Sequence, residues 1–582
     1  MRRTKIVCTI GPASENVETL CQLITSGMNV ARLNFSHGSH DEHARRIKNI
    51  REAVKITGQQ VAIMLDTQGP EIRTGFLEEG KILLEPGQKV TLTSNEIIGN
   101  KNKIHINHKG LAQDIQRDNI ILLDDGLIAL KVLEVSGVNV FCEVLNGGEL
   151  GNRKGVNIPG VNVSLPALTE KDISDIKFGV EQGLDFIAAS FIRSANDALE
   201  IRKVLEELNS DINIIAKIEN QQGVNNVDDI IMVTDGLMIA RGDLGVEIPA
   251  EDVPLVQKML IEKCNCVGKP VITATQMLDS MIRNPRPTRA EASDVANAIL
   301  DGTDAIMLSG ETAAGKYPVE AVKTMDRIAR KAETAIKYEE ITRSKKFVRT
   351  TTPDAISHAT CTTAEDLRAE AIITATESGS TSRMVSKYRP RPPIIAVTPS
   401  RAVQRRLLLV WGVVPLYAPK VEGTDAMVNQ AIEVSLEAKL IKNGDLVVIT
   451  TGVPVGIPGT TNLLRVEVVG QYLSKGTSIG EGCVTGIVRV VENGLEAQEK
   501  IKPGEILVAT YTDADYVPAL EKVAAIITEE AGLTSHGAIV GLSLGIPVVV
   551  GVKDATQVLK TGTLVSIDMN RGLIYRGKAN II

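Results

Sequence analysis

Between Thr4 and Gly310, short and strongly apolar runs alternate with segments of helical period, and this alternation restricts the possible folds more than any other feature of the sequence. Strands that are covered on both faces read as continuous apolar runs, so the pattern is typical of β-α units around a parallel sheet. The predicted strands are residues 5–9, 30–35, 61–66, 186–191, 212–218, 236–240, 270–274 and 305–308. Eight parallel strands predict an α/β fold with a closed (β/α)8 (TIM) barrel, and an open doubly wound sheet is the alternative.

The polar residues of this region favour the barrel. In (β/α)8 barrels, catalytic side chains come from several strand ends at the C-terminal mouth. A purely structural role would scatter polar side chains, whereas here they follow the C-terminal ends of most predicted strands. These residues are Asn34, Ser36, Asp66, Thr67, Ser190, Lys217, Glu219, Arg241, Asp243, Thr273, Thr275, Ser309 and Glu311.

The rest of the chain predicts three further domains. Residues 70–169 form an insertion with strand-like runs at 81–84, 89–93, 120–123, 128–134 and 138–144. A barrel loop that long is expected to be a β-rich domain of its own, and above the mouth it would act as a lid. The barrel itself takes residues 1–69 and 170–342. A second α/β domain is expected at 343–473, with strands at 371–374, 394–398, 414–416, 446–450 and 464–469. A short linker from Ser474 then opens a compact last domain, 474–582.

Charge and hydropathy exclude some classes of partner. A net charge of −7 over 582 residues argues against a nucleic-acid partner, which would need a concentrated basic face. The longest apolar runs, such as 546–552, are far shorter than the ~20 residues needed to cross a bilayer. No secretory leader is recognisable either, so we expect a cytoplasmic location without membrane attachment. The seven cysteines are scattered, and we expect them to be reduced and mostly buried.

Lys217 and Glu219 lie two residues apart at a strand end, so their side chains share a face. In isolation the pair would most simply be a structural ion pair. The next strand, however, ends at Arg241-Gly242-Asp243, and two carboxylates from neighbouring strand ends form the sparse oxygen site that Mg²⁺ prefers. Beside that metal, Lys217 would neutralise a transferring phosphoryl group or an enolate. A barrel lyase with Lys217 as a Schiff-base nucleophile is the alternative.

A second oxygen-rich cluster is expected from Asn34, Ser36, Asp66 and Thr67. With one carboxylate and otherwise neutral oxygens, it suits a weakly charged cation, although such residues are also common in turns and caps. Arg32 lies on the strand that leads into the mouth. Because a buried guanidinium calls for an anion, Arg32 is a candidate clamp for phosphate or carboxylate.

Two loops resemble phosphate sites. Residues 310–316 match the first seven positions of a P-loop, but Tyr317 replaces the metal-binding Ser or Thr, so no P-loop is expected. Residues 376–382 (TESGSTS) follow a predicted strand and precede a helical segment. Hydroxyls and N–H groups at a helix start can cradle a phosphate, and a simple capping loop is the alternative.

Six stretches carry a resemblance to a known family. They are residues 31–37 (ARLNFSH), 65–75 (LDTQGPEIRTG), 214–220 (IIAKIEN), 240–245 (ARGDLG), 273–277 (TATQM) and 308–312 (LSGET). In the order and spacing of these six stretches, the sequence is similar to the pyruvate kinase family up to about position 473. The resemblance implies transfer of the phosphoryl group of phosphoenolpyruvate to ADP, giving pyruvate and ATP in the last step of glycolysis.

The resemblance also implies cofactors and residue roles. Glu219 and Asp243 would hold Mg²⁺ (or Mn²⁺), and Lys217 would stabilise the phosphoryl group in flight. Asn34, Ser36, Asp66 and Thr67 match the family's K⁺ site, and Glu71 goes with K⁺ activation. Phosphoenolpyruvate would be contacted by Arg32 and Thr275 and by the backbone of Gly242 and Asp243. The nucleotide would be contacted by Arg73, Lys154 and His37. The family's proton donor to the enolate is thought to be a water network near Thr275.

Two further implications concern the C-terminal part. The domain at 343–473 resembles the family's regulatory domain, with a phosphorylated small-molecule effector held by Thr376, Ser378, Gly379, Ser380 and Thr381. The family's usual assembly, a homotetramer, is expected by the same resemblance.

The last domain departs from the common family plan. Residues 532–540 (GLTSHGAIV) and 544–548 (LGIPV) resemble the mobile phosphohistidine domain of phosphoenolpyruvate-using dikinases and synthases. Those carriers usually have Ala-Arg where this chain has Gly541-Leu542, so a charge partner for a phosphate is missing. We therefore expect a domain kept for packing or regulation. A phosphoenolpyruvate-dependent phosphocarrier acting through His536 is the alternative.

Overall fold

The computed structural model describes residues 1–342, 351–452, 460–470 and 472–579. These residues form two compact units. The first comprises Met1–Lys337 together with Arg401–Val413, and the second comprises the remaining described residues. Among the residues described, no helix combines the length and the hydrophobicity needed to cross a bilayer.

The first unit contains a closed barrel of eight parallel strands, which confirms the predicted barrel and excludes the open sheet. Around the barrel the order is β1-β16-β15-β14-β13-β12-β3-β2. The strands are β1 (Lys5–Thr9), β2 (Val30–Asn34), β3 (Ala62–Asp66), β12 (Phe186–Ala189), β13 (Asn213–Ile218), β14 (Gly236–Ala240), β15 (Val271–Ala274) and β16 (Ala305–Leu308). Almost every position is buried, as expected for strands with an inner core and an outer layer of helices.

The helices of this unit surround the barrel, and several of them begin at a capping box. In α2, α4, α5 and α10 the side chain of the N-cap residue accepts from the third residue of the helix, whose own side chain accepts from the N-cap. Three short helices, α6, α8 and α11, begin within three residues of a strand end. The helices are α1 (Val17–Ser26), α2 (His40–Thr57), α4 (Glu170–Glu181), α5 (Ala195–Glu207), α6 (Gln221–Asn225), α7 (Val227–Val233), α8 (Arg241–Glu247), α9 (Val253–Val267), α10 (Arg289–Leu300), α11 (Gly310–Ala313) and α12 (Pro318–Glu333).

A segment from later in the chain packs against the barrel core. It consists of α16 (Arg401–Arg406) and a single turn of 3₁₀ helix, Leu407–Leu409. Leu408 and Leu409 join the core cluster inside the barrel with Val7 and Val30. Arg405 forms an ion pair of 2.8 Å with Asp185, just before β12.

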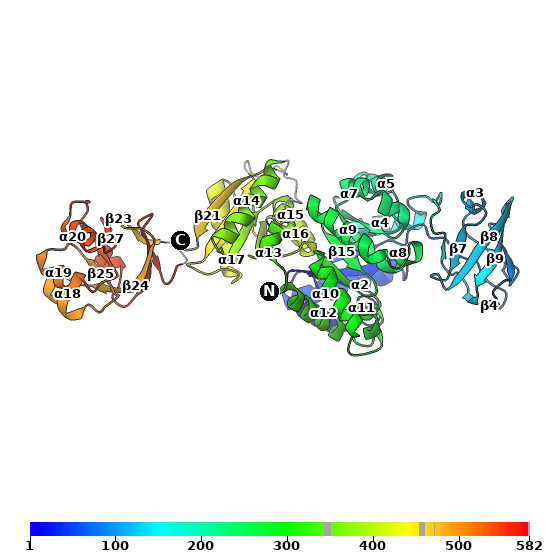
Figure 1. The fold of residues 1–582 in the computed structure, drawn as a ribbon, viewed down its shortest axis with the longest axis horizontal. Coiled ribbons are helices and arrows are strands. Elements are labelled where there is room, and N and C mark those ends of the chain that lie inside the picture. Colours follow the sequence, from blue (N-terminus) through cyan, green and yellow to red (C-terminus); the bar gives the residue numbers. More distant parts are fainter. Residues whose placement is uncertain (343–350, 453–459, 471, 580–582) are drawn as a thin grey trace. The chain divides into compact units, whose positions relative to one another are not determined.

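The insertion is β-rich, as predicted. Its six-stranded sheet has the order β11-β7-β8-β9-β5-β6, and β10 pairs with β4. Figure 1 shows β7, β8 and β9 side by side. The prediction missed the short strands β6, β10 and β11. The elements are β4 (Lys81–Leu84), β5 (Lys89–Thr93), β6 (Lys103–His105), α3 (Leu111–Asp114), β7 (Ile120–Leu123), β8 (Ile128–Ser136), β9 (Asn139–Asn146), β10 (Gly148–Gly151) and β11 (Val156–Asn157).

The second unit begins with an α/β layer whose sheet has the order β19-β18-β17-β20-β21. Strand β17 is parallel to β18 and β20, and β21 returns antiparallel to β20. The elements are α13 (Tyr338–Thr342), α14 (Thr352–Asp366), β17 (Ala371–Ala375), α15 (Ser380–Lys387), β18 (Ile394–Thr398), β19 (Val413–Tyr417), α17 (Thr424–Glu437), β20 (Leu446–Gly452) and β21 (Thr461–Val468).

The C-terminal part of this unit is an eight-stranded sheet in the order β22-β29-β28-β24-β25-β26-β27-β23. The linker predicted from Ser474 is wrong, because Tyr472–Lys475 (β22) pairs with β29 and Thr477–Ile479 (β23) pairs with β27. The remaining elements are β24 (Cys483–Val490), α18 (Gly494–Lys500), β25 (Ile506–Ala509), α19 (Val517–Leu520), β26 (Ala525–Thr528), α20 (His536–Leu544), β27 (Val548–Val550), α21 (Ala555–Val558), β28 (Leu564–Asp568) and β29 (Leu573–Arg576).

Gly476 separates β22 from β23, the two strands at opposite ends of this strand order, and lies against β27. A Cβ at position 476 would lie 2.6 Å from the Val550 carbonyl oxygen and 2.7 Å from a methyl of Val549. Only glycine allows so close an approach.

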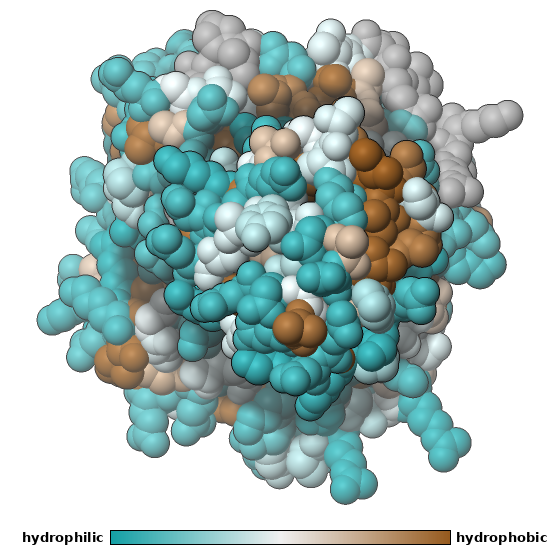
Figure 2. Space-filling view, turned by 90° about the vertical axis from the view of Figure 1, so that its left-hand side faces the viewer, coloured by the Kyte–Doolittle hydropathy of each residue, from teal (hydrophilic) through white to brown (hydrophobic). Residues whose placement is uncertain are grey.

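In the face seen in Figure 2, hydrophobic side chains gather in small groups among hydrophilic ones.

Candidate active site

Lys217 lies at the C-terminal end of β13 between two carboxylates. Its ammonium is 2.9 Å from Oε1 of Glu219 and 3.1 Å from Oδ1 of Asp66, which ends β3. It also donates to the Ser190 hydroxyl over 2.8 Å. Burial disfavours the charged form, but Asp66 and Glu219 outweigh it and raise the pKa of Lys217 above the ordinary value of lysine. A raised pKa favours the protonated amine, which argues against the Schiff-base alternative, because a Schiff-base nucleophile needs a neutral amine.

Arg32 and Asp66 extend this buried network across β2 and β3. The Arg32 guanidinium donates from Nε to Oδ2 of Asp66 over 2.5 Å and from Nη1 to the Thr9 hydroxyl over 2.9 Å. Burial alone would raise the pKa of Asp66, but Arg32 and Lys217 outweigh it and hold that pKa below the usual range. Two cations therefore share the Asp66 carboxylate, and one of them, Lys217, also pairs with Glu219.

Glu219 and Asp243 are the predicted Mg²⁺ ligands, and the chemistry of the pair fits a divalent cation. Glu219 is 2% exposed and accepts the Phe191 N–H over 2.7 Å. Asp243 is exposed, yet partial desolvation and then repulsion by Glu219 raise the pKa of Asp243 to about 7. Such an excess of negative charge is relieved by a cation. Among the described residues no group of three or more His, Cys, Asp or Glu could hold a metal, so the remaining positions would be filled by water and substrate oxygens.

The predicted K⁺ ligands come from two neighbouring strand ends. Asn34 on β2 is the register partner of Asp66 on β3, and Thr67 follows directly. The Asn34 side-chain oxygen accepts the Ser36 N–H over 3.1 Å, and the Thr67 hydroxyl accepts the Ser190 N–H over 3.1 Å. Because the single carboxylate is already shared by Arg32 and Lys217, the donor set is close to neutral. Such a set fits a monovalent cation better than a divalent one.

Thr275 and Gly242, the predicted contacts to phosphoenolpyruvate, lie together. The Gly242 N–H donates to the Thr275 hydroxyl over 2.8 Å, and this hydroxyl donates to the Ala274 carbonyl over 2.7 Å. Thr275 adopts a φ of +63°, which is costly for a β-branched residue. Strain of this kind is often retained at functional sites.

Two of the three predicted nucleotide contacts, Arg73 and His37, line one cleft between the insertion and the barrel. The Arg73 guanidinium pairs with Glu71 over 2.7 Å, and the Lys154 ammonium pairs with Asp124 over 2.9 Å. The segments that carry Arg73 and Lys154 are hydrogen-bonded to each other, because the Thr74 N–H donates to the Lys154 carbonyl over 2.8 Å.

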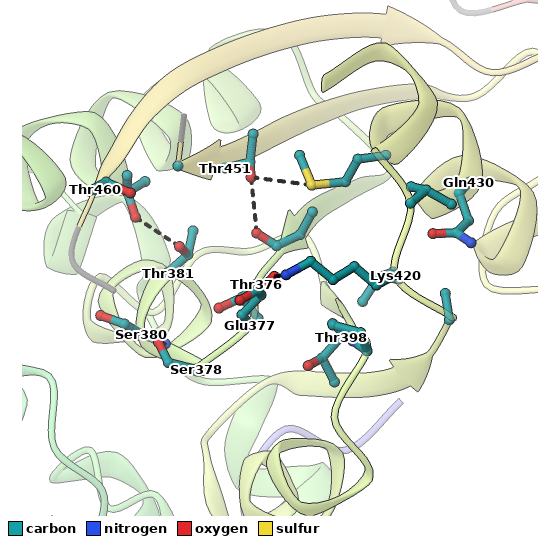
Figure 3. Close-up of a pocket in the computed structure, with 18 of the residues that line it drawn as sticks. Thr376, Glu377, Ser378, Ser380, Thr381, Thr398, Lys420, Gln430, Thr451 and Thr460 are labelled. Carbon is teal, nitrogen blue, oxygen red and sulfur yellow. Dashed lines mark hydrogen bonds and ion pairs between the residues drawn. The ribbon is translucent and has the colours of Figure 1, made fainter. Parts of the chain in front are cut away.

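The predicted effector loop lines a pocket of the second unit. Thr376, Ser378, Ser380 and Thr381 contribute to its wall, and Gly379, with a φ of +79°, is the N-cap of α15. In Figure 3 Lys420 extends from across the pocket toward Glu377 beside Thr376. The ammonium of Lys420 lies 2.7 Å from the Glu377 carboxylate. Thr381 shares a hydrogen bond of 2.8 Å with Thr461 on β21.

Sequence reasoning missed some members of these sites. Lys420 was not predicted, and Glu377 was included only as part of the stretch 376–382, because an isolated ion pair leaves no pattern in the sequence. Ser190 was noted only as a polar strand end, although it bonds both Lys217 and the Thr67 carbonyl, the latter over 2.6 Å. Its place at a barrel strand end was the available signal.

The fold and the site define a (β/α)8-barrel enzyme that gathers cationic side chains and carboxylates at the C-terminal mouth for chemistry on a small anion. Comparison with protein families gives the more specific answer. Residues 1–322 match the family model "Pyruvate kinase, barrel domain", and residues 354–467 match "Pyruvate kinase, alpha/beta domain". Residues 501–572 match "PEP-utilising enzyme, mobile domain". The chain belongs to the pyruvate kinase family.

Curated relatives match along the whole chain. A pyruvate kinase of Geobacillus stearothermophilus is 58% identical over 585 residues, and one of Bacillus licheniformis is 57% identical over 586 residues; both matches cover 100% of each chain. A crystal structure of a pyruvate kinase from Cryptosporidium parvum superposes with a TM-score of 0.78 at 43% identity. That match covers 81% of this chain and 96% of the other. The full-length relatives therefore share the last domain as well.

Proposed function

We propose that this chain transfers the phosphoryl group of phosphoenolpyruvate to ADP at the C-terminal mouth of the barrel. The bond between phosphorus and the enol oxygen breaks, and a bond to a terminal oxygen of ADP forms. The enolate left behind takes a proton at carbon and becomes pyruvate. The observation that carries the proposal is the charged Lys217, 2.9 Å from Glu219 and 3.1 Å from Asp66, within a chain of this family.

The proposed roles follow from charge and position. Lys217 and Arg32 neutralise the phosphoryl oxygens as negative charge moves, which is the kind of preorganised stabilisation that lowers a barrier most. Thr275 and the backbone of Gly242 and Asp243 orient the carboxylate of phosphoenolpyruvate. Arg73, Lys154 and His37 orient the phosphates of ADP, so that both reactants are held in line.

Two cations complete the proposed site. Glu219 and Asp243 would hold Mg²⁺ or Mn²⁺, whose charge would polarise phosphoryl oxygens. Asn34, Ser36, Asp66 and Thr67 would hold K⁺, and Glu71 supports activation by K⁺ through the family resemblance.

The remaining proposals concern regulation and organisation. A phosphorylated small molecule would bind the pocket of Thr376, Ser378, Gly379, Ser380 and Thr381. We also propose domain boundaries at 1–69 with 170–342, 70–169, 343–473 and 474–582, assembly into a homotetramer, and a cytoplasmic location.

The last domain is proposed to serve packing or regulation rather than phosphate transfer. His536 begins α20, and its Nδ1 shares a hydrogen bond of 3.1 Å with the Thr512 hydroxyl. The residue at the carriers' arginine position, Leu542, is 71% exposed and offers a phosphate no charge.

The test is pyruvate formation from phosphoenolpyruvate and ADP with Mg²⁺, in buffers of equal ionic strength containing K⁺ or Na⁺. We expect turnover with Mg²⁺ and a clear increase with K⁺. No turnover under any of these conditions would refute the proposed reaction. Equal rates in K⁺ and Na⁺ would refute only the role of K⁺.

A further inference from the structure

The first turn of α4, where the chain returns from the insertion to the barrel, contacts two different loops of the candidate site. Helix α4 begins after the N-cap Thr169, and the next residues include Lys171 and Asp172. Lys171 contacts the loop that follows β2, and Asp172 contacts the loop that follows β3. The four residues proposed to bind K⁺ lie in these two loops or at the strand ends that lead into them.

Lys171 holds the peptide between two of those residues. Its ammonium donates to the Phe35 carbonyl over 2.5 Å, and Phe35 separates Asn34 from Ser36. The direction of that carbonyl fixes the orientation of the peptide, and with it the positions of the side chains on either side. Phe35 itself is 1% exposed and stacks on His43 with ring centroids 3.9 Å apart, so the loop has little freedom to adjust.

Asp175 in turn orients Lys171. One carboxylate oxygen of Asp175 lies 2.8 Å from the Lys171 ammonium, and the other lies 2.7 Å from Nε2 of His40. Asp175 is 2% exposed, whereas the side chain of Lys171 is 46% exposed. A long and partly solvated lysine is thus anchored by a buried charge, which reduces the entropy cost of holding the Phe35 carbonyl.

Asp172 holds the second loop, which follows β3. Its Oδ1 accepts the Gly69 N–H over 3.0 Å, while its Oδ2 accepts the N–H and hydroxyl of Thr169 in the capping box. Gly69 lies two residues after Thr67 and has a φ of +75°. Asp172 is fully buried, so this contact is shielded from competing water. The capping box requires only Oδ2, and the contact to Gly69 is additional to it.

We propose that Lys171 and Asp172 are positioning residues for the monovalent-cation site, which one helical turn holds by clamping both of its loops. The inference rests on the proposed function, because the cation site belongs to that proposal. Neither residue is proposed to touch the cation. Loss of the clamp is expected to weaken cation binding while leaving the reacting groups on β13 and α8 in place.

The experiment compares Lys171→Met with Lys177→Met, the same substitution at an exposed lysine of the same helix. Two quantities are measured at constant ionic strength as Na⁺ is replaced: the K⁺ concentration for half-maximal pyruvate formation, and Tl⁺ binding followed by ²⁰⁵Tl NMR. Lys171→Met should raise both half-saturation concentrations about tenfold, the scale of a lost hydrogen bond to a charged group. The KM for phosphoenolpyruvate at saturating K⁺ should stay within about twofold, because Thr275, Gly242 and Asp243 are on other elements and Arg32 lies within β2 rather than in the loop that Lys171 contacts.

Rescue separates positioning from general stability. Lys171→Arg should recover most of the cation affinity. Asp175→Asn, which removes the charge that anchors Lys171 and also alters the contact to His40, should give an intermediate shift. Asp175→Asn also serves as the informative variant if Lys171→Met does not fold. Unchanged half-saturation in Lys171→Met, or an equal shift in Lys177→Met, would overturn the proposal. If the wild type forms no pyruvate, the proposed function is refuted. The Tl⁺ measurement alone then tests whether Lys171 positions the monovalent-cation site.

Discussion

Two buried lysines of the barrel show how the surroundings decide the role of a residue. Lys217 has two carboxylates within 3.1 Å, and they raise its pKa. Lys5, at the start of β1, is 5% exposed and donates to the Val413 carbonyl over 2.6 Å. Burial and then the charge of Arg2 lower the pKa of Lys5 to about 7. The surroundings therefore favour the charged form of Lys217 and the neutral form of Lys5.

Lys5 is expected to make stability depend on pH. Its pKa is about 7 in the folded chain, whereas the ordinary pKa of a solvated lysine is 10.5. Between these values the unfolded chain binds more protons, so the free energy of unfolding rises with pH in this window. The rise between pH 7 and pH 9 is about 2–3 kcal/mol at ~1.4 kcal/mol per pH unit. In Lys5→Met this contribution is absent, and the variant should be more stable than the wild type at pH 7.

Urea unfolding of the wild type and Lys5→Met at pH 7 and pH 9 measures this difference. Lys48→Met, at an exposed lysine of α2, is the control and should keep the wild-type pH dependence. The same pH dependence in the wild type and Lys5→Met would show that Lys5 does not titrate in this range.

Much of the candidate site could be predicted at this scale, because strand ends of a barrel meet at one mouth. Lys217, Glu219, Asp66 and Arg32 were recognised in this way. The bond from Lys217 to Ser190 could not be, since it depends on how β12 and β13 pair when the barrel closes. Lys5 gave no signal either, because a lysine at a strand start is ordinary in any sequence.

At the scale of elements, strong hydrophobic periodicity predicted the strands reliably, whereas short strands that pair with distant parts of the chain were not predicted. The eight barrel strands were predicted with boundaries shifted by at most two residues. The segment from Ser474 read as a linker because it is short and polar. The partners of β22 and β23, which are β29 and β27, lie about seventy or more residues further along the chain. Pairing over such a distance determines their structure, and local sequence does not reveal it.

Helix α20 allows a test of close packing. A Cβ at Gly541 would lie 2.1 Å from a methyl group of Val548 on β27. Alanine favours a helix over glycine by about 1 kcal/mol, but overpacking costs about 1–3 kcal/mol, so Gly541→Ala should lower stability. The side chain at position 548 is the obstacle.

A double-mutant cycle with Val548→Ala, followed by thermal unfolding, isolates this contact. Alanine at position 541 should be tolerated or favourable once Val548 is shortened. A Gly541→Ala variant that is more stable than the wild type would contradict the packing account.

At the scale of the whole molecule, the order of elements along the chain differs from their grouping in space. Arg401–Val413 lies within the region predicted as the second α/β domain, yet it packs with the barrel unit. The Trp411 N–H donates to the Asp304 carboxylate over 3.1 Å, next to β16. The segment contains the apolar run 407–411 (LLLVW), which could pack in either buried core. Sequence alone therefore could not show which core it belongs to.

A second join links the last domain to the α/β layer within the second unit. Leu446 and Val468, on the paired strands β20 and β21, share a small core with Tyr575 and Ala579. Strand β21 also contributes Thr461 to the pocket of the proposed effector loop. The relatives that match along their full length are consistent with a last domain retained as part of this unit.

The central claim, that Lys217 stabilises the phosphoryl group in flight, is tested most directly by the kcat of Lys217→Met for pyruvate formation at saturating phosphoenolpyruvate, ADP, Mg²⁺ and K⁺. Lys177→Met is the matched control and should retain the wild-type rate. The account predicts that Lys217→Met lowers kcat by ~10³ or more, the scale of losing a preorganised charge at the transition state. A kcat within about tenfold of the wild type, or ~1.4 kcal/mol in the barrier, would contradict it.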